Sequence, residues 1–155
     1  MNKDLSDKLY KIVDKSIKIL KGLDVSGSNS KISPGKWMTQ EIIGHLIDSA
    51  ANNRQRFVIL QYDPEQSFIR YDQDKWVDIQ DYRNADWDTL IDFWVLYNRL
   101  IAGIISKIPE ETLKMTVKDG EKLTFREADR GIDLEYLIED YIIHLKHHLG
   151  KLIDI

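Results

Sequence analysis

The sequence predicts an all-α protein, a four-helix bundle that forms a single domain over residues 1–155. Four segments carry apolar residues at the three-to-four spacing of an amphipathic helix. The chain has only eight glycines and three prolines. So few helix breakers favour long helices over many short strands joined by tight turns. In addition, one connection is long enough to run the whole length of a bundle.

The first two helices are expected at about residues 4–24 and 38–60. The first ends in a small polar run, and Pro34-Gly35 extends the break. Thr39 is the expected N-cap of the second helix. Their apolar faces consist of Leu5, Leu9, Ile12, Val13 and Leu20 in the first helix and Ile42, Ile43, Leu46, Ala50 and Phe57 in the second.

The last two helices are expected at about residues 86–107 and 133–153. Asp86 and Asp133 are placed to cap their first turns, and Pro109 closes the earlier helix. Their apolar faces consist of Leu90, Ile91, Trp94, Tyr97, Leu100, Ile101 and Ile104 in one and Leu134, Leu137, Ile138, Tyr141, Leu145, Leu149 and Leu152 in the other.

Two connections are long. Residues 61–85 have little helical period. A helix of 23 residues is about 34 Å long, and such a connection can stretch further. It therefore allows the second and third helices to be parallel, which an up-down-up-down bundle would not require. In residues 110–132, Asp119-Gly120 stands between alternating segments, and this pattern predicts a small hairpin before the last helix.

Composition excludes several kinds of site and partner. The chain has no cysteine, which removes disulfides, thiolate metal sites and a nucleophilic cysteine. The formal net charge of −4 argues against a broad face for nucleic acid. No apolar run approaches the roughly 18 residues of a membrane span, and the first residues lack the apolar core of a signal peptide. We therefore expect a cytoplasmic protein that binds neither nucleic acid nor a membrane.

The four histidines predict a metal site between two helices. His144 and His148 are four residues apart, so they share one helix face and can bind one ion. A projection at about 100° per residue sets both beside the apolar seam and turns His147 toward solvent. A first-row metal needs a third ligand, and His45 is the histidine that remains. If the second and third helices are parallel, His45 comes level with the other two.

A three-histidine centre has three alternatives. The histidine spacing could be due to chance, or the histidines could belong to one of two well-known kinds of metal site. An H-x-x-x-H pair occurs on helices by chance, and the macrodipole favours basic residues in a last turn. A zincin requires HExxH, but Leu145 follows His144. A di-iron bundle requires two Glu-x-x-His pairs, and no glutamate stands three residues before a histidine. The remaining metal site is mononuclear, with three histidines and open positions.

Polar residues near the histidines are candidates for supporting roles. Asp48 and Asp140 could each accept a hydrogen bond from an imidazole, although both equally suit a solvated helix face. Arg56 could bind an anionic thiol co-substrate or pair with a carboxylate. No catalytic residue is identified.

Aromatic residues in the long connection are candidates for contact with a substrate. Tyr71 and Trp76, together with Tyr82, could wall a cleft for an apolar electrophile, or they could pin the connection to the bundle. A packing role is expected for Trp37, Trp87 and Trp94.

Several motifs, in order from about Trp37 to Leu152, resemble the DinB/YfiT-like family of metal-binding four-helix proteins: KWMTQEIIGHLIDSAANNRQRF, YDQDKWVDIQDY, a tryptophan-rich third helix and DYIIHLKHHLGKL. The resemblance implies the crossover topology, a homodimer and a divalent metal. Nickel or zinc is expected first, with manganese or iron as further options. Matched by motif, the implied ligands are His45 of GHLID and His144 and His148 of HLKHH. The charged segment 110–132 is longer than the family pattern, so no substrate residue is carried over there.

The resemblance also implies an activity. Characterised relatives are thiol-dependent S-transferases, and other members are described as candidate metal-dependent hydrolases. The expected function is therefore a detoxifying transferase that conjugates a small-molecule electrophile to a low-molecular-weight thiol. Because the chain has no cysteine, the sulfur must come from the co-substrate. The alternatives are a metal-dependent hydrolase and a stress protein that binds a metal or ligand without turnover.

Overall fold

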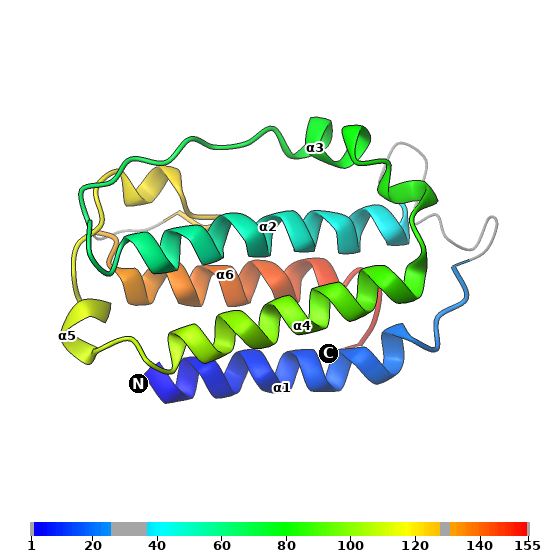
Figure 1. Cartoon of the computed structure of the whole chain (residues 1–155), viewed down its shortest axis with the longest axis horizontal. Coiled ribbons are helices and arrows are strands. Elements are labelled where there is room, and N and C mark those ends of the chain that lie inside the picture. Colours follow the sequence, from blue (N-terminus) through cyan, green and yellow to red (C-terminus); the bar gives the residue numbers. More distant parts are fainter. Residues whose placement is uncertain (1, 26–36, 128–130, 155) are drawn as a thin grey trace.

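A computed structural model describes residues 2–25, 37–127 and 131–154. This part of the chain is all-α, which confirms the predicted fold class, and its four long helices form a bundle (Figure 1). None of its helices is both long and apolar enough to cross a membrane. The break predicted at Pro34-Gly35 lies outside the described residues. The long helices are α1 (Asn2–Leu20), α2 (Thr39–Ile59), α4 (Trp87–Ile105) and α6 (Leu134–Leu149), and the short ones are α3 (Gln73–Ile79), η2 (Tyr82–Asn84), α5 (Glu110–Leu113) and η3 (Gly120–Lys122).

The long helices do not follow an up-down-up-down order. Helices α2 and α4 run in the same direction, and α1 and α6 run opposite to them (Figure 1). Each of α1 and α2 packs mainly on α4 and α6, so the order around the bundle is α1, α4, α2, α6. The connection between α2 and α4 returns along the length of the bundle, as Figure 1 shows. This arrangement confirms the predicted crossover.

The crossover contains more helix than the sequence predicts. Helix α3 begins after Asp72, whose carboxylate accepts a hydrogen bond from the Lys75 backbone N–H at 3.1 Å. With seven residues and Val77 as its buried residue, α3 is too short to produce a visible apolar period. Further along, a Cβ on Gly44 of α2 would lie 2.1 Å from Cδ2 of Tyr82. A glycine at this position therefore lets the crossover approach α2 closely.

Side-chain caps define the starts of α4 and α6. Asp86 accepts from the Thr89 backbone N–H at 2.8 Å, and Asp133 accepts from that of Tyr136 at 2.8 Å, so both predicted caps are confirmed. Helix α2 differs, because its N-cap is Met38 and not Thr39. The Glu41 carboxylate accepts from the Met38 backbone N–H at 2.6 Å. This bond places the helix start one residue earlier than the Thr39 hydroxyl alone would suggest.

The hairpin predicted in residues 110–132 is wrong. Asp119 is left-handed (φ 52°), but a 3-10 turn follows it and the described part of 121–132 forms no return strand. Instead, the backbone N–H of Val117 donates to the Ile132 carbonyl at 2.8 Å, and Thr116 bridges Asp133. Gly120 packs so closely on Ile132 that a Cβ would lie 2.5 Å from the isoleucine Cβ. The segment thus pairs with the start of α6, a contact that local turn chemistry does not reveal.

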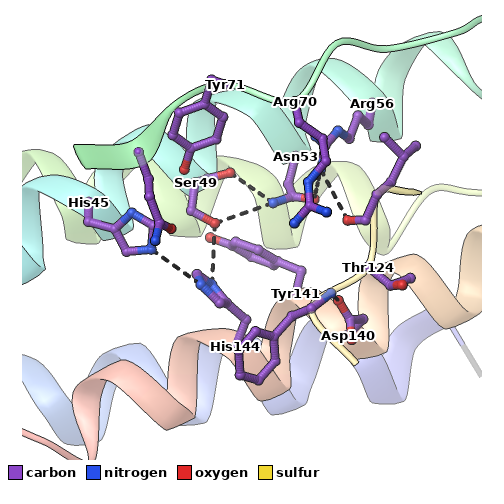
Figure 2. Close-up of a pocket in the computed structure, with 13 residues that line it drawn as sticks. His45, Ser49, Asn53, Arg56, Arg70, Tyr71, Thr124, Asp140, Tyr141 and His144 are labelled. Atoms are coloured by element: carbon purple, nitrogen blue, oxygen red, sulfur yellow. Dashed lines mark hydrogen bonds between the residues drawn. The ribbon is translucent and has the colours of Figure 1, made fainter. Parts of the chain in front are cut away.

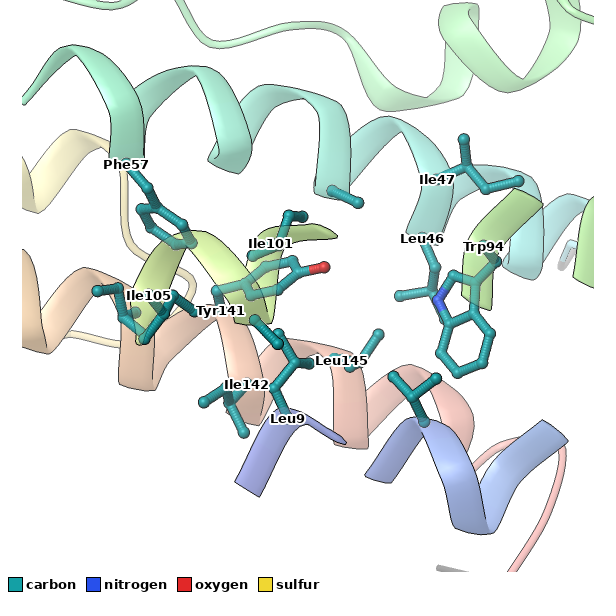
Figure 3. Packing of buried hydrophobic residues seen from close by; sticks show 14 of the residues in the cluster. Leu9, Leu46, Ile47, Phe57, Trp94, Ile101, Ile105, Tyr141, Ile142 and Leu145 are labelled. Carbon is teal, nitrogen blue, oxygen red and sulfur yellow. The ribbon is translucent and has the colours of Figure 1, made fainter. Parts of the chain in front are cut away.

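The core contains large side chains from all four long helices (Figure 3). Trp94 and Phe57 are completely buried, and Tyr141 is 2% exposed. The hydroxyl of Tyr141 donates to Oδ1 of Asn98 at 2.5 Å, and the Asn98 amide donates to the Trp94 carbonyl at 2.9 Å. These bonds satisfy polar groups in the middle of an apolar core. The core therefore fixes α2, α4 and α6 relative to one another, and with them the end of the bundle where the histidines lie.

Candidate metal centre

The three predicted histidines meet at one end of the bundle. His45 lies in the second turn of α2, and His144 and His148 are one turn apart near the end of α6. One ring nitrogen from each lies within 4.8 Å of the other two, and Nε2 of His45 is 3.3 Å from Nε2 of His144 (Figure 2). His147 is exposed and lies outside this cluster. Because α2 and α6 are antiparallel, the start of one and the end of the other are level, as the crossover prediction requires.

The geometry suits a small divalent cation. Two imidazole nitrogens bound at about 2.0–2.1 Å to a tetrahedral ion lie about 3.3–3.4 Å apart. The separation between His45 and His144 matches this value. Three histidines leave a fourth position open, as in catalytic zinc sites. We conclude that the cluster can hold a metal ion, and the ligand role of each histidine stays a prediction.

Burial keeps the three imidazoles neutral. It lowers the pKa of His45 to about 3, that of His144 to about 4 and that of His148 to about 2. Desolvation is the largest cause for each, and the neighbouring imidazoles and Lys151 lower the pKa values further, whereas Asp140 partly opposes the shift at His144. Neutral imidazoles carry the lone pairs that bind metals. The cluster is therefore prepared for a cation at neutral pH.

Two aromatic side chains cover the histidines. The Trp37 ring is 4.7 Å from that of His45 and 6.3 Å from that of His148, measured between centroids. The Phe125 ring lies 5.2 Å from that of His144. The sequence predicts only packing for Trp37, and this residue packs directly on two candidate ligands. Both aromatic residues lie outside the long helices, so no helical period indicates them.

Hydrogen bonds further orient the histidines. Oγ of Ser49 is 3.4 Å from Nδ1 of His144, and Nζ of Lys151 is 3.4 Å from Nδ1 of His148. Nδ1 of His45 is buried and has no hydrogen-bond partner within the described part of the chain. Ser49 follows His45 by one helical turn, so the i, i+4 spacing along α2 could have identified it.

The two predicted aspartates have other partners. Asp48 accepts hydrogen bonds from the Gln80 amide at 3.0 Å and from the Tyr82 hydroxyl at 2.7 Å. Asp140 accepts from the Phe125 and Arg126 backbone N–H groups and from Nε of Arg126. Neither carboxylate accepts from an imidazole among the described residues, which corrects the expectation that they orient one. Asp48 instead holds the crossover on α2, and Asp140 holds the segment before α6 on that helix.

A cavity of about 130 Å³ opens beside His45 and His144 (Figure 2). Arg56 and Tyr71, both predicted to contact a substrate, line it. Trp76 does not; it is 40% exposed and packs on Tyr71 with ring centroids 4.8 Å apart. Tyr82 is buried against α2 and holds the crossover. The sequence assigns no role in the site to the other residues that line the cavity: Ser49, Asn53, Arg70, Gln73, Leu123, Thr124, Phe125 and Tyr141.

Known proteins resemble the chain in sequence and in structure. No protein-family model matches it. Curated relatives from Bacillus cereus and Bacillus anthracis, named as candidate metal-dependent hydrolases, are 24% identical over 136 residues, which cover 87% of this chain and 73% of theirs. YfiT from Bacillus subtilis, described as "a probable metal-dependent hydrolase with an unusual four-helix bundle topology", has a TM-score of 0.80 at 18% identity and covers 97% of this chain and 83% of its own. The chain therefore has the YfiT fold and, as its motifs predict, resembles the DinB/YfiT-like family over most of its length.

Proposed function

We propose that the chain is a metal-dependent hydrolase that uses a divalent ion at His45, His144 and His148. The observation that supports this most strongly is the convergence of three neutral imidazoles at the edge of a cavity. The names given to the Bacillus relatives agree with it. Nickel and zinc are the first metals to test, followed by manganese and iron.

The surrounding residues have defined roles in this proposal. A divalent ion held there would lower the pKa of water and act as a Lewis acid toward a substrate oxygen. With Nε2 of His144 on the ion, its Nδ1–H can donate to the Ser49 hydroxyl, which fixes the ring orientation. Trp37 and Phe125 limit the access of bulk water to the rings. The cavity holds the substrate next to His45 and His144.

A second candidate is the thiol S-transferase predicted from the sequence. One observation favours it: Arg56 lies in the same cavity as His45 and His144, where an anionic thiol would need a cation. The S–H bond of the thiol would break as its sulfur forms a C–S bond to the electrophile. In a displacement the leaving group departs and the thiol proton is released with it, and in an addition the product takes up the proton. The protein supplies no sulfur nucleophile of its own, because it has no cysteine.

Alanine at both His144 and His148 tests the hydrolase. We expect metal affinity to fall by more than about 100-fold and metal-dependent ester hydrolysis to be lost, because two of three ligands are gone. The measurements are the metal content of the purified full chain and the hydrolysis rate of 4-nitrophenyl acetate before and after chelation. His147→Ala, on the same helix but outside the cluster, is the control and keeps both properties.

Each alternative has its own signature in these assays. Metal retained by the double variant, or hydrolysis unaffected by chelation, contradicts the proposal. Chelator-sensitive conjugation of 1-chloro-2,4-dinitrobenzene to a small thiol, without thiol-free hydrolysis, supports the transferase. Bound metal with neither activity supports the binding protein.

A further inference from the structure

A buried arginine, Arg56, lines the cavity. Arg56 is 7% exposed. Its Nη1 donates long hydrogen bonds to Oδ1 of Asn53 at 3.4 Å and to the Leu123 carbonyl at 3.5 Å. Across the ranges that the structure describes, no carboxylate forms an ion pair with it. A guanidinium stays charged in proteins, and burying a charge without a counter-charge is costly. The guanidinium of Arg56 therefore suits an anionic ligand.

A second arginine faces the same space. Arg70, from the crossover, lines the cavity together with Arg56. Burial lowers the pKa of Arg56 most, Tyr71 partly opposes this shift, and the charge of Arg70 adds to it. Figure 2 shows both at the end of the cavity away from His45. The other charged lining residue, Asp140, is already matched by Arg126 and by backbone N–H groups. This end of the cavity is therefore positive.

The cavity connects the two arginines with the histidines. His45, Ser49, Asn53 and Arg56 follow one another along one side of α2 and all line it. Along the helix axis, Arg56 is about 16 Å beyond His45. The hydrogen bond to Asn53 shows that the Arg56 side chain leans back toward the histidines. A volume of about 130 Å³ is small beside the roughly 300–1,000 Å³ of drug-sized pockets, so the ligand must also be small.

We propose that Arg56 and Arg70 bind the carboxylate or phosphate group of a small anionic substrate whose reacting bond lies near His45 and His144. The inference rests on the proposed hydrolase for its reaction. In that reaction, water adds hydroxyl to the acyl carbon and a proton to the leaving group, and the acyl C–O or C–N bond breaks. The arginines take no part in that exchange. They position the substrate by charge-assisted hydrogen bonds.

Anion binding is tested without catalysis. Isothermal titration of the full chain with succinate, and separately with inorganic phosphate, should show saturable binding that persists after chelation. Arg56→Gln should weaken it by about tenfold or more, because charged hydrogen bonds are lost. Arg70→Gln, at an exposed residue, provides a second test if the buried variant misfolds. Arg99→Gln, which removes a surface ion pair with Asp14, should bind as wild type does.

Paired esters connect the anion to the reaction. The substrates are 4-nitrophenyl acetate, which is uncharged, and mono-4-nitrophenyl succinate, which carries a carboxylate. In Arg56→Gln and Arg70→Gln, the ratio of KM for the charged ester to KM for the neutral ester should rise by about tenfold or more. Equal effects on the two esters, or anion binding that is the same in both variants as in wild type, would overturn the inference. If the wild-type protein hydrolyses neither ester, the proposed function is overturned instead. The titration then still decides whether the two arginines bind an anion.

Discussion

The histidines of the candidate centre are stabilised in the form that binds metal. Each imidazole is shielded from water, and each neighbouring ring adds a further penalty for protonation. In the unfolded chain the same side chains titrate near their ordinary pKa of about 6.5. Folding of the metal-free protein therefore depends on pH. Below about pH 6.5 the three histidines bind protons in the unfolded state and remain neutral in the folded state.

His45→Gln tests this dependence. Because the folded pKa of His45 is about 3 and the unfolded one about 6.5, the free energy of unfolding should fall as pH drops through this interval. The slope is about 1.4 kcal/mol per pH unit for each histidine that stays neutral. Urea unfolding of the chelated full chain at pH 7 and at pH 5 measures it, and His45→Gln should be less sensitive than wild type. His147→Gln serves as the control. A variant as pH-sensitive as wild type would contradict the assignment.

The sequence predicts some residues of the site better than others. His45, His144 and His148 follow from helical spacing, since a regular helix fixes which residues share a face. Ser49 and Asn53 lie on the same face of α2 as His45 and could have been found in this way. Trp37, Arg70 and Phe125 could not, because they come from irregular segments whose path depends on tertiary contacts. Asp48 and Asp140 show what helical spacing cannot predict. It places each carboxylate near a histidine, but it does not reveal the other hydrogen-bond donors that bind both carboxylates.

At the scale of elements, a close contact at Gly44 helps to hold the crossover on α2. Tyr82 packs over Gly44, and its hydroxyl donates to Asp48 one turn further along the helix. The same connection carries Tyr71 and Arg70 into the cavity. Its attachment to α2 therefore determines the shape of the site as well as the packing of the crossover.

Gly44→Ala should disrupt the packing of Tyr82 on α2. Its Cβ would overlap the Tyr82 ring, so the free energy of unfolding should fall by about 1–3 kcal/mol in urea unfolding experiments. Gly103→Ala in α4 is the matched control, since no described atom beyond its own stretch of helix would lie nearer than 4.0 Å to the new Cβ. It should be neutral or stabilise the chain by up to about 1 kcal/mol, through helix propensity. Equal effects at the two glycines would contradict the contact.

The elements themselves are predictable where they are long. All four bundle helices are expected within a few residues of their observed ends, and the Asp86 and Asp133 caps are identified. Short elements are not predictable in this way, because α3 offers only two turns of pattern. The hairpin predicted at Asp119-Gly120 is wrong for another reason. Its local chemistry suits a hairpin, but pairing with Ile132 and Asp133 competes successfully for the same backbone groups.

At the scale of the whole molecule, the length of the crossover predicts the topology correctly. A connection able to return along the bundle permits parallel neighbours, and α2 and α4 are parallel (Figure 1). Sequence alone could not establish the order of helices around the bundle, since each apolar face suits several partners. That order follows from the observed packing.

The homodimer implied by the family resemblance stays a prediction. Light scattering of the purified full chain, coupled to size-exclusion chromatography, should give twice the mass of one chain at micromolar concentration. A single-chain mass across the measured range would contradict it. The three histidines come from one chain, so metal content per chain should not depend on the association state.

The order α1, α4, α2, α6 also affects how quickly the chain can fold. No neighbouring pair of long helices in this arrangement is joined by a short turn, since even α2 and α4 are separated by the crossover. The Asn2 side chain, for example, donates to the Ile108 carbonyl at 2.9 Å, which joins residues 106 positions apart. Every helix pair must therefore close a long loop, at an entropic cost, before its contacts contribute. We expect this bundle to cross a higher kinetic barrier than an up-down bundle of equal length.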